Sequence, residues 1–270
     1  MGLPVFEAAF QIRCVQAGKS FDLNPWSISA PVIAAAAVGA GCWASVAPSA
    51  QIFGKTIHHL PERGAARQIA LTFDDGPNPR VTPDLLDLLE RHQARATFFL
   101  VGRFVQACPE LVREIAVRGH LLANHTETHP HMIFLSRARI RRELRECDEA
   151  VQEALSSAIA PTESIRREPG QSSMKYMRPP FGFRGPQMDG VVRAFGLEGV
   201  VMWSRLCYDW KPQPPGRMIA RLALVQPRDI VLMHDGDHRH LGGDRAHVVQ
   251  ALAHWLPLWR DAGFEFVTIS

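Results

Sequence analysis

The sequence of 270 residues lacks the cysteine patterns of disulfide-rich and zinc-ribbon proteins. Its five cysteines are odd in number and include no CxxC pair, so neither a disulfide framework nor a cysteine-based zinc site is indicated. It also lacks a long basic run: the net charge is only +3, and the arginines of 139–142 and 166–167 stand in short, mixed stretches. These features do not indicate a nucleic-acid partner. The apolar content of 46% is that of a globular protein with a full core.

Charge is absent from Leu23 to Gly54, and within that span residues 31–47 are almost all small and apolar. The run suits the hydrophobic region of an export signal and approaches the roughly 20 residues of a membrane span. An alanine-rich packing helix is the alternative. We predict an N-terminal region, 1–67, with a membrane anchor or export signal in 23–54 and a linker after it. A membrane-anchored or exported protein is therefore favoured over a cytoplasmic one.

Strand and helix patterns alternate through the remaining domain, 68–270. Strands are predicted at 68–73, 96–101, 121–124, just before 177, and at 199–203, 229–233 and 264–269. Helices are predicted from 82, and at 109–118, 136–155, 187–195, 216–225 and 246–261, with a polar loop at 156–175. This rhythm predicts an α/β fold with about seven parallel strands in a small or distorted (β/α) barrel.

Two adjacent carboxylates, Asp74 and Asp75, end the first of these strands, where ligands bind in such folds. A helix-capping aspartate beside a solvated turn aspartate is the alternative. The next chemistry-bearing segment, Asn124 to Pro130, carries His125 and His129. Histidines four residues apart lie on one side of a turn and suit one metal ion, although an isolated HxxxH match is usually coincidental. With Asp75 they make the three-ligand set of a catalytic zinc site.

Three later segments also follow predicted strands. The run Arg178-Pro179-Pro180-Phe181-Gly182 is stiffened by two prolines, which aims the arginine. The run Tyr208-Asp209-Trp210 is followed by Leu232-Met233-His234-Asp235-Gly236. A histidine beside a buried aspartate has a raised pKa and suits a general acid. Each segment also has a structural alternative. The first would be a surface turn with a salt-bridging arginine, and His234 would be a core or rim histidine.

The ordered segments TFDDGP, HTxTH, RPPFG, DW and LMHDG resemble the motifs of the polysaccharide deacetylases, carbohydrate esterase family 4 with the NodB-homology domain. The resemblance covers residues 68–269 and implies a NodB-type barrel, a catalytic domain at 68–270 and removal of N-acetyl groups from N-acetylglucosamine in peptidoglycan or a chitin-like glycan. It makes Asp74 similar to the catalytic base, and Asp75, His125 and His129 similar to the metal ligands. Arg178 resembles the residue that holds the base, Asp209 the one that tunes the acid, and His234 the acid.

For the substrate, the resemblance implies that the Phe181 backbone amide is an oxyanion donor within a Pro180-Phe181 turn, and that Trp210 and Leu232 wall the acetyl-methyl pocket. Two positions depart from the family pattern. Leu206 stands where the family often has an acid, and Phe181 where tyrosine is common. Two alternatives stay open: a related amidohydrolase of a small-molecule C–N bond, and a catalytically silent glycan-binding domain.

The expected cofactor is one divalent ion, Zn²⁺ or else Co²⁺, Ni²⁺ or Mn²⁺, because the Asp-His-His set accepts each of them. We expect a carbohydrate substrate, no nucleic acid and a monomer. Among the histidines outside the motifs, His131, His238 and His240 are expected near the rim of the site, where a second metal role is the alternative. The others are expected on the surface or in packing.

Overall fold

The computed structural model describes residues 25–62, 66–156 and 173–269. The chain divides into two units, Met1–Gly41 and Cys42–Ser270, and the second unit holds the sheet. Helix α1 spans Pro25–Val46 and contains all but the last residue of the apolar run at 31–47. None of the described helices combines the length and the apolar character required to cross a membrane. Most of the predicted loop at 156–175, and the whole of residues 1–22, lie outside the described residues.

A parallel sheet organises the second unit. Its strands run in the order β1-β6-β5-β4-β3-β2-β8-β7, every ladder along this path is parallel, and β9 pairs with the first residues of β2. The strands are β1 (Thr56–Ile57), β2 (Arg67–Gly76), β3 (Ala96–Leu100), β4 (Leu121–Asn124), β5 (Tyr176–Met177), β6 (Gly199–Val201), β7 (Arg205–Leu206), β8 (Ile230–His234) and β9 (Phe264–Phe266). No ladder between described residues joins β7 to β1, so the barrel is incomplete.

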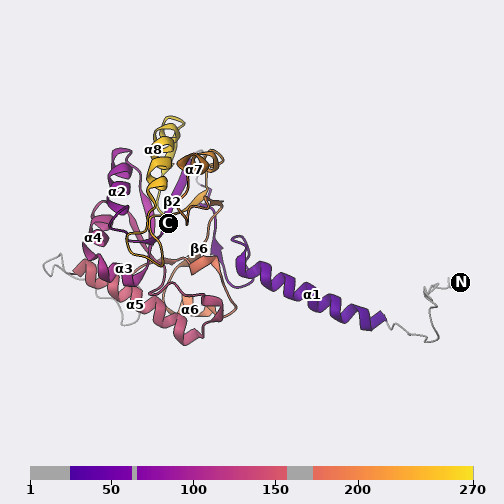
Figure 1. Cartoon of the computed structure of the whole chain (residues 1–270). Helices are drawn as coiled ribbons and strands as arrows, with labels where there is room; N and C mark the ends of the chain where they lie inside the picture. The colour runs from indigo at the N-terminus through magenta and orange to yellow at the C-terminus, as the bar shows by residue number, and fades with distance from the viewer. Residues whose placement is uncertain (1–24, 63–65, 157–172, 270) are drawn as a thin grey trace. The chain divides into compact units, whose positions relative to one another are not determined.

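Helices surround this sheet (Figure 1). They are α2 (Thr82–Arg91), α3 (Gly102–Ala107), α4 (Pro109–Val117), α5 (Arg137–Ser156), α6 (Met188–Ala194), α7 (Pro215–Leu222) and α8 (Ala246–Asp261). The central strands are apolar on both faces because helices cover the outside while side chains fill the inside, as in other parallel sheets. In β3 all five residues are buried, and in β2 only the first two are not. The helices bury leucine and valine stripes against these strands.

The topology confirms the predicted α/β fold with a distorted parallel barrel. The described residues contain nine strands rather than about seven, because two-residue β1 and β7 carry too little pattern to be seen in sequence. Part of the predicted linker is built into the sheet, since Thr56 and Ile57 pair with Val200 and Val201 of β6. The structure also adds the short helix α3, which the sequence analysis did not predict.

Candidate active site

The two carboxylates lie where β2 ends, between β3 and β8. Asp74 is in register with Phe99 of β3 on one side and with His234 of β8 on the other. The turn that follows packs tightly against the end of β8. A Cβ on Gly236 would lie 1.9 Å from the Asp75 carbonyl oxygen, so only glycine fits there. The sequence thus brings a carboxylate and an imidazole side by side through strand pairing.

Asp74 is buried and held by a buried arginine. Arg178 donates from Nη1 to Asp74 Oδ1 at 2.6 Å and to Thr72 Oγ1 at 2.9 Å. Its remaining nitrogens donate to the carbonyl oxygens of Val201 and Met202, at 3.2 and 3.0 Å. A buried ion pair of this kind is strongly oriented because each of the three guanidinium nitrogens donates to a fixed acceptor. Asp74 Oδ1 is therefore engaged, and Oδ2 is the oxygen that faces His125 Nε2, at 3.7 Å.

A second buried cluster consists of Asp75 and the imidazoles of His125 and His129. Asp75 Oδ1 lies 3.5 Å from His125 Nε2 and 3.2 Å from His129 Nε2. Burial disfavours the charged form of Asp75, but contacts with His125, His129 and His238 outweigh it and lower the pKa of Asp75 well below its ordinary value. Burial lowers the pKa of His129 to about 4. At neutral pH the group therefore contains a carboxylate and a neutral imidazole, which are the forms that bind metals.

The contacts of Asp75 with the two imidazoles have the spacing of metal ligands, although the group whose ligand atoms all lie within 4.8 Å of one another, among the described residues, has His238 in place of His125. In a tetrahedral zinc site with ligand bonds of roughly 2.0 to 2.2 Å, neighbouring ligand atoms lie about 3.3 to 3.5 Å apart. The two Asp75 distances, 3.5 and 3.2 Å, are close to that spacing. Asp75 Oδ1 has no hydrogen-bond partner among the described residues although it is buried, which a cation would remedy. His125 Nδ1 lies 2.8 Å from the Arg178 carbonyl oxygen, and donation there leaves Nε2 free to bind an ion.

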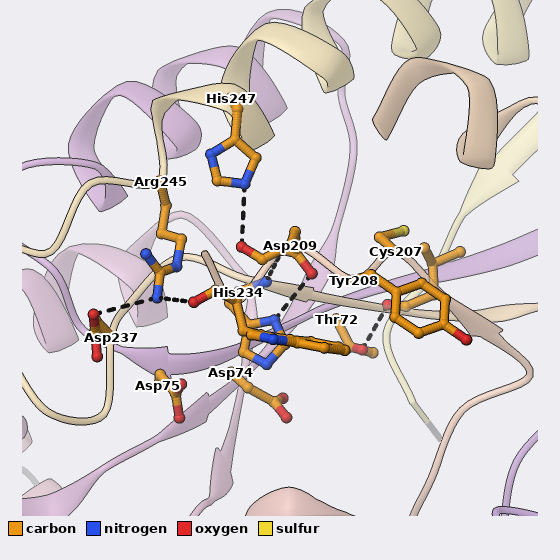
Figure 2. Close-up of polar contacts among 12 residues, drawn as sticks. Thr72, Asp74, Asp75, Cys207, Tyr208, Asp209, His234, Asp237, Arg245 and His247 are labelled. Carbon is orange, nitrogen blue, oxygen red and sulfur yellow. Dashed lines mark hydrogen bonds and ion pairs between the residues drawn. The ribbon is translucent and has the colours of Figure 1, made fainter. Parts of the chain in front are cut away.

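On the other side of Asp74, His234 is paired with Asp209 (Figure 2). One oxygen of the Asp209 carboxylate accepts from the His234 backbone N–H at 2.7 Å, and the other lies 3.0 Å from His234 Nδ1. Burial disfavours the imidazolium, but Asp209 outweighs it, with help from Asp75 and Asp74, and raises the pKa of His234 to about 9. The imidazole is thus protonated at neutral pH, with Nε2 not engaged by Asp209.

The segment that carries Asp209 is held by residues near the start of α8. His247 Nε2 lies 3.1 Å from the Asp209 carbonyl oxygen, and the buried Arg245 donates to the Trp210 carbonyl oxygen at 2.7 Å. Arg245 also lies 3.5 Å from Asp237 (Figure 2). These supporting contacts are not predicted from the sequence. Arg245 and His247 come after the loop that follows the LMHDG segment, and no sequence spacing links them to Asp209.

A cavity of about 560 Å³ opens over these groups. It is lined by Asp74, Asp75, His125, His129, Phe181, Trp210, Leu232 and His234, together with Leu206 and part of the loop after β8. Asp209 and Arg178 are fully buried behind it. Pro180 is buried in the short helix η2 (Pro180–Gly182) and is not among the residues that line the cavity. Pro180 therefore contributes by fixing the backbone of the turn that carries Phe181, and it does not form the cavity wall.

His238 lies inside this site rather than at its rim. The ligand atoms of Asp75, His129 and His238 all lie within 4.8 Å of one another. His238 Nδ1 is 3.5 Å from Asp75 Oδ2, and its ring stacks on that of His129, with centroids 4.2 Å apart. With a side chain that is 25% exposed, His238 lines the cavity and lies deeper in it than the rim position expected from the sequence. His240, by contrast, has a side chain that is 76% exposed.

Backbone strain is concentrated in the same place. Among the non-glycine residues described with a positive φ, five belong to these segments: Asp75, Thr126, His129, Phe181 and Tyr208, with φ between 54° and 70°. Each such residue costs free energy, on the order of 1 to 3 kcal/mol, and persists only where the surroundings enforce it. The concentration of strained residues around the cavity marks it as a functional site.

Comparison with known proteins points to one family. A family model described as polysaccharide deacetylase matches residues 62–200. A chitooligosaccharide deacetylase of Bradyrhizobium sp. is 35% identical over 206 residues, which cover 74% of this chain and 87% of that protein. A peptidoglycan-N-acetylglucosamine deacetylase of Bacillus cereus is 34% identical over 205 residues, covering 75% and 86%. A solved peptidoglycan N-acetylglucosamine deacetylase, in complex with 4-naphthalen-1-yl-N-oxidanyl-benzamide, has a TM-score of 0.66 at 28% identity and covers 79% of this chain and 90% of its own.

Proposed function

Because the chain belongs to the polysaccharide deacetylase family, we propose that it hydrolyses the N-acetyl group of N-acetylglucosamine units in a glycan, releasing acetate and a free amine. Relatives named for chitooligosaccharides and for peptidoglycan both support the reaction class. A location in the cell envelope belongs to the same proposal, since peptidoglycan is one of the two glycans. The chemistry falls to the domain at 68–270.

One observation carries the proposal: a carboxylate and an imidazolium lie in register across β2 and β8, beside a group that suits a metal ion. Asp74 and His234 are that pair. Amide hydrolysis needs a proton acceptor for the attacking water, stabilisation of the oxyanion and a proton donor for the leaving amine. The site offers a candidate for each of these roles.

The proton acceptor is Asp74. Its Oδ1 is engaged by Arg178 at 2.6 Å, so Oδ2 receives the proton as water adds to the acyl carbon. Asp75, His125 and His129 would hold the divalent ion, and a bound ion would lower the pKa of water and polarise the acyl carbonyl. The Phe181 backbone amide is the proposed oxyanion donor, and such a donor is worth roughly 2.7 to 4 kcal/mol.

The proton donor is His234. Its Nδ1 is engaged by Asp209, so Nε2 delivers the proton to the amine as the C–N bond breaks. The pKa of about 9 keeps this proton available at neutral pH. A glycan-binding domain would need neither this donor nor the acceptor, which argues against a catalytically silent role.

The aromatic lining of the cavity favours a sugar polymer over a small molecule. Two exposed aromatic side chains line the cavity, Trp210 at 44% exposure and Phe181 at 41%. Exposed aromatic side chains of this kind suit the apolar faces of sugar rings. Trp210 and Leu232 are the proposed walls for the acetyl methyl group.

Acetate release tests the proposal. The purified protein would be loaded with Zn²⁺ and assayed on chitooligosaccharides and on acetylated peptidoglycan fragments, with metal content measured on the same sample. We expect acetate from at least one glycan and a loss of about 10²-fold or more in Asp74→Asn, which keeps its metal. If the zinc-loaded protein released no acetate from either glycan, or if Asp74→Asn turned over at the normal rate, the proposed mechanism would be wrong.

A further inference from the structure

We propose that His238 is a positioning residue of the metal site, fixing the Asp75 carboxylate through one contact and the His129 ring through another. This inference rests on the proposed function, because it concerns how the chain presents Asp75, His125 and His129 to a divalent ion. His238 lies four residues beyond His234, in the loop between β8 and α8. None of the motifs that identify the family includes it.

The two oxygens of Asp75 face different partners. Oδ1 is turned toward the Nε2 atoms of His125 and His129, at 3.5 and 3.2 Å. Oδ2 is turned toward His238 Nδ1, at 3.5 Å. A polar contact to the second oxygen restricts rotation of the carboxylate, and supports of this kind set the affinity of metal sites. His238 therefore keeps Oδ1 directed at the two imidazoles.

The two imidazoles differ in how they are held. His125 is oriented by the 2.8 Å contact between its Nδ1 and the Arg178 carbonyl oxygen. His129 Nδ1 is buried and has no hydrogen-bond partner among the described residues. Its ring is instead packed face to face on His238, with centroids 4.2 Å apart and planes at 21°, and edge-on against Phe181 at 4.5 Å. For His129, stacking thus takes the place of the hydrogen bond that orients His125.

The stacked geometry argues for positioning rather than for a fourth ligand. A metal ion lies close to the plane of each imidazole that binds it. The nearly parallel, stacked rings of His129 and His238 lie in different planes, so one ion does not lie in both. The loop is also anchored from outside, because Arg103 of α3 donates to the His238 carbonyl oxygen. The hydrogen bond from Arg103 therefore fixes the His238 backbone next to Asp75 and His129.

Metal affinity separates this role from a general effect on the loop. Three variants divide the contacts: His238→Ala removes both, His238→Phe keeps a stacking ring, and His238→Asn keeps a donor. His240→Ala is the matched control, since His240 lies on the same loop and contacts Asp237 instead of a proposed ligand, at 3.7 Å. The dissociation constant for Zn²⁺ would be measured by competition with a chelator. The visible absorption spectrum of the Co²⁺ form and the melting temperature of the metal-free protein would be recorded alongside.

We expect His238→Ala to bind Zn²⁺ about 10- to 100-fold more weakly, with His238→Phe and His238→Asn in between and His240→Ala within about twofold of the unmodified protein. Unchanged affinity in His238→Ala, or an equal loss in His240→Ala, would overturn the inference. A Co²⁺ spectrum that loses a nitrogen ligand in His238→Ala would also overturn it, since His238 would then be a ligand. In each of these outcomes the proposed function would stand as long as the unmodified protein binds metal and releases acetate. If the unmodified protein did neither, the proposed function itself would be wrong.

Discussion

Replacing Asp209 with asparagine should convert the proposed acid into a residue that is deprotonated at working pH. Asp209 accepts from the His234 backbone N–H and faces His234 Nδ1, and it is fully buried. Asparagine has the same size and keeps one acceptor for the backbone N–H. Its amide nitrogen would face Nδ1 and favour the neutral imidazole, so the charge is removed with little change in packing.

The size of the effect follows from the pKa of His234. Burial lowers this pKa and Asp209 is the largest contribution that raises it, to about 9 from an ordinary 6.5. At about 1.4 kcal/mol per pKa unit, the rise corresponds to about 3 kcal/mol of stabilisation of the imidazolium. This stabilisation is present in full below pH 6.5 and is lost as the pH rises through about 9. Without Asp209 the pKa should return toward 6.5.

The assay is the pH dependence of acetate release in both proteins. At about pH 8 an imidazole with a pKa of 9 is about 90% protonated and one with a pKa of 6.5 about 3%, so Asp209→Asn should lose about 30-fold in turnover. At about pH 6 the same comparison predicts less than a twofold loss. A divalent ion beside Asp75 lowers the pKa of His234 in both proteins, so the observable is the difference between the two midpoints.

Asp229→Asn is the matched control for this experiment. Asp229 is a buried carboxylate, like Asp209, but it accepts from Ser204 at 2.6 Å and has no contact with His234. Its substitution should leave the midpoint of the pH profile in place even if the melting temperature falls. Superimposable profiles for Asp209→Asn and the unmodified protein, or a loss of the same size at pH 6 and pH 8, would refute the assignment of His234 as the acid.

Two further substitutions test the other buried groups. Arg178→Met leaves the Asp74 carboxylate buried without its cation and should lower the free energy of unfolding by about 3 to 5 kcal/mol, measured by urea denaturation. A loss below about 1 kcal/mol would mean that the pair is screened by water. His125→Ala removes a proposed ligand and should lose bound metal and acetate release together, as determined by elemental analysis and the acetate assay. Full metal content in this variant would exclude His125 from the ligand set.

The fold could be predicted from the sequence because its signals are local. Apolar runs such as 68–73 end at Asp-Gly or Gly-Pro turns, and helices such as α8 carry a clear apolar stripe. Where those signals fail, the elements are short: β1 and β7 have two residues each and α3 has six. Elements of that length are fixed by the strands and helices that they pack against rather than by their own sequence.

The site residues divide in the same way. Asp74, Asp75, His125 and His234 directly follow or end strands, so their meeting at one edge follows from the parallel topology. His238 belongs to a loop that also contains His240, and nothing in the sequence tells the two apart. One contacts Asp75 at 3.5 Å, whereas the other is largely exposed. The path of a loop depends on anchors such as Arg103, which lies more than a hundred residues earlier in the chain.

The register between β2 and β8 has a consequence for how this domain can diversify. The proposed proton acceptor and proton donor are directly paired residues, Asp74 and His234, so the separation of their backbones is tied to the strand spacing of about 4.8 Å common to all sheets. Surrounding loops are free to lengthen, shorten or exchange side chains without altering that separation. Under the proposed function, changes in these loops would alter which acylated sugar binds, while the backbone pairing keeps the proposed acid and base at a constant separation.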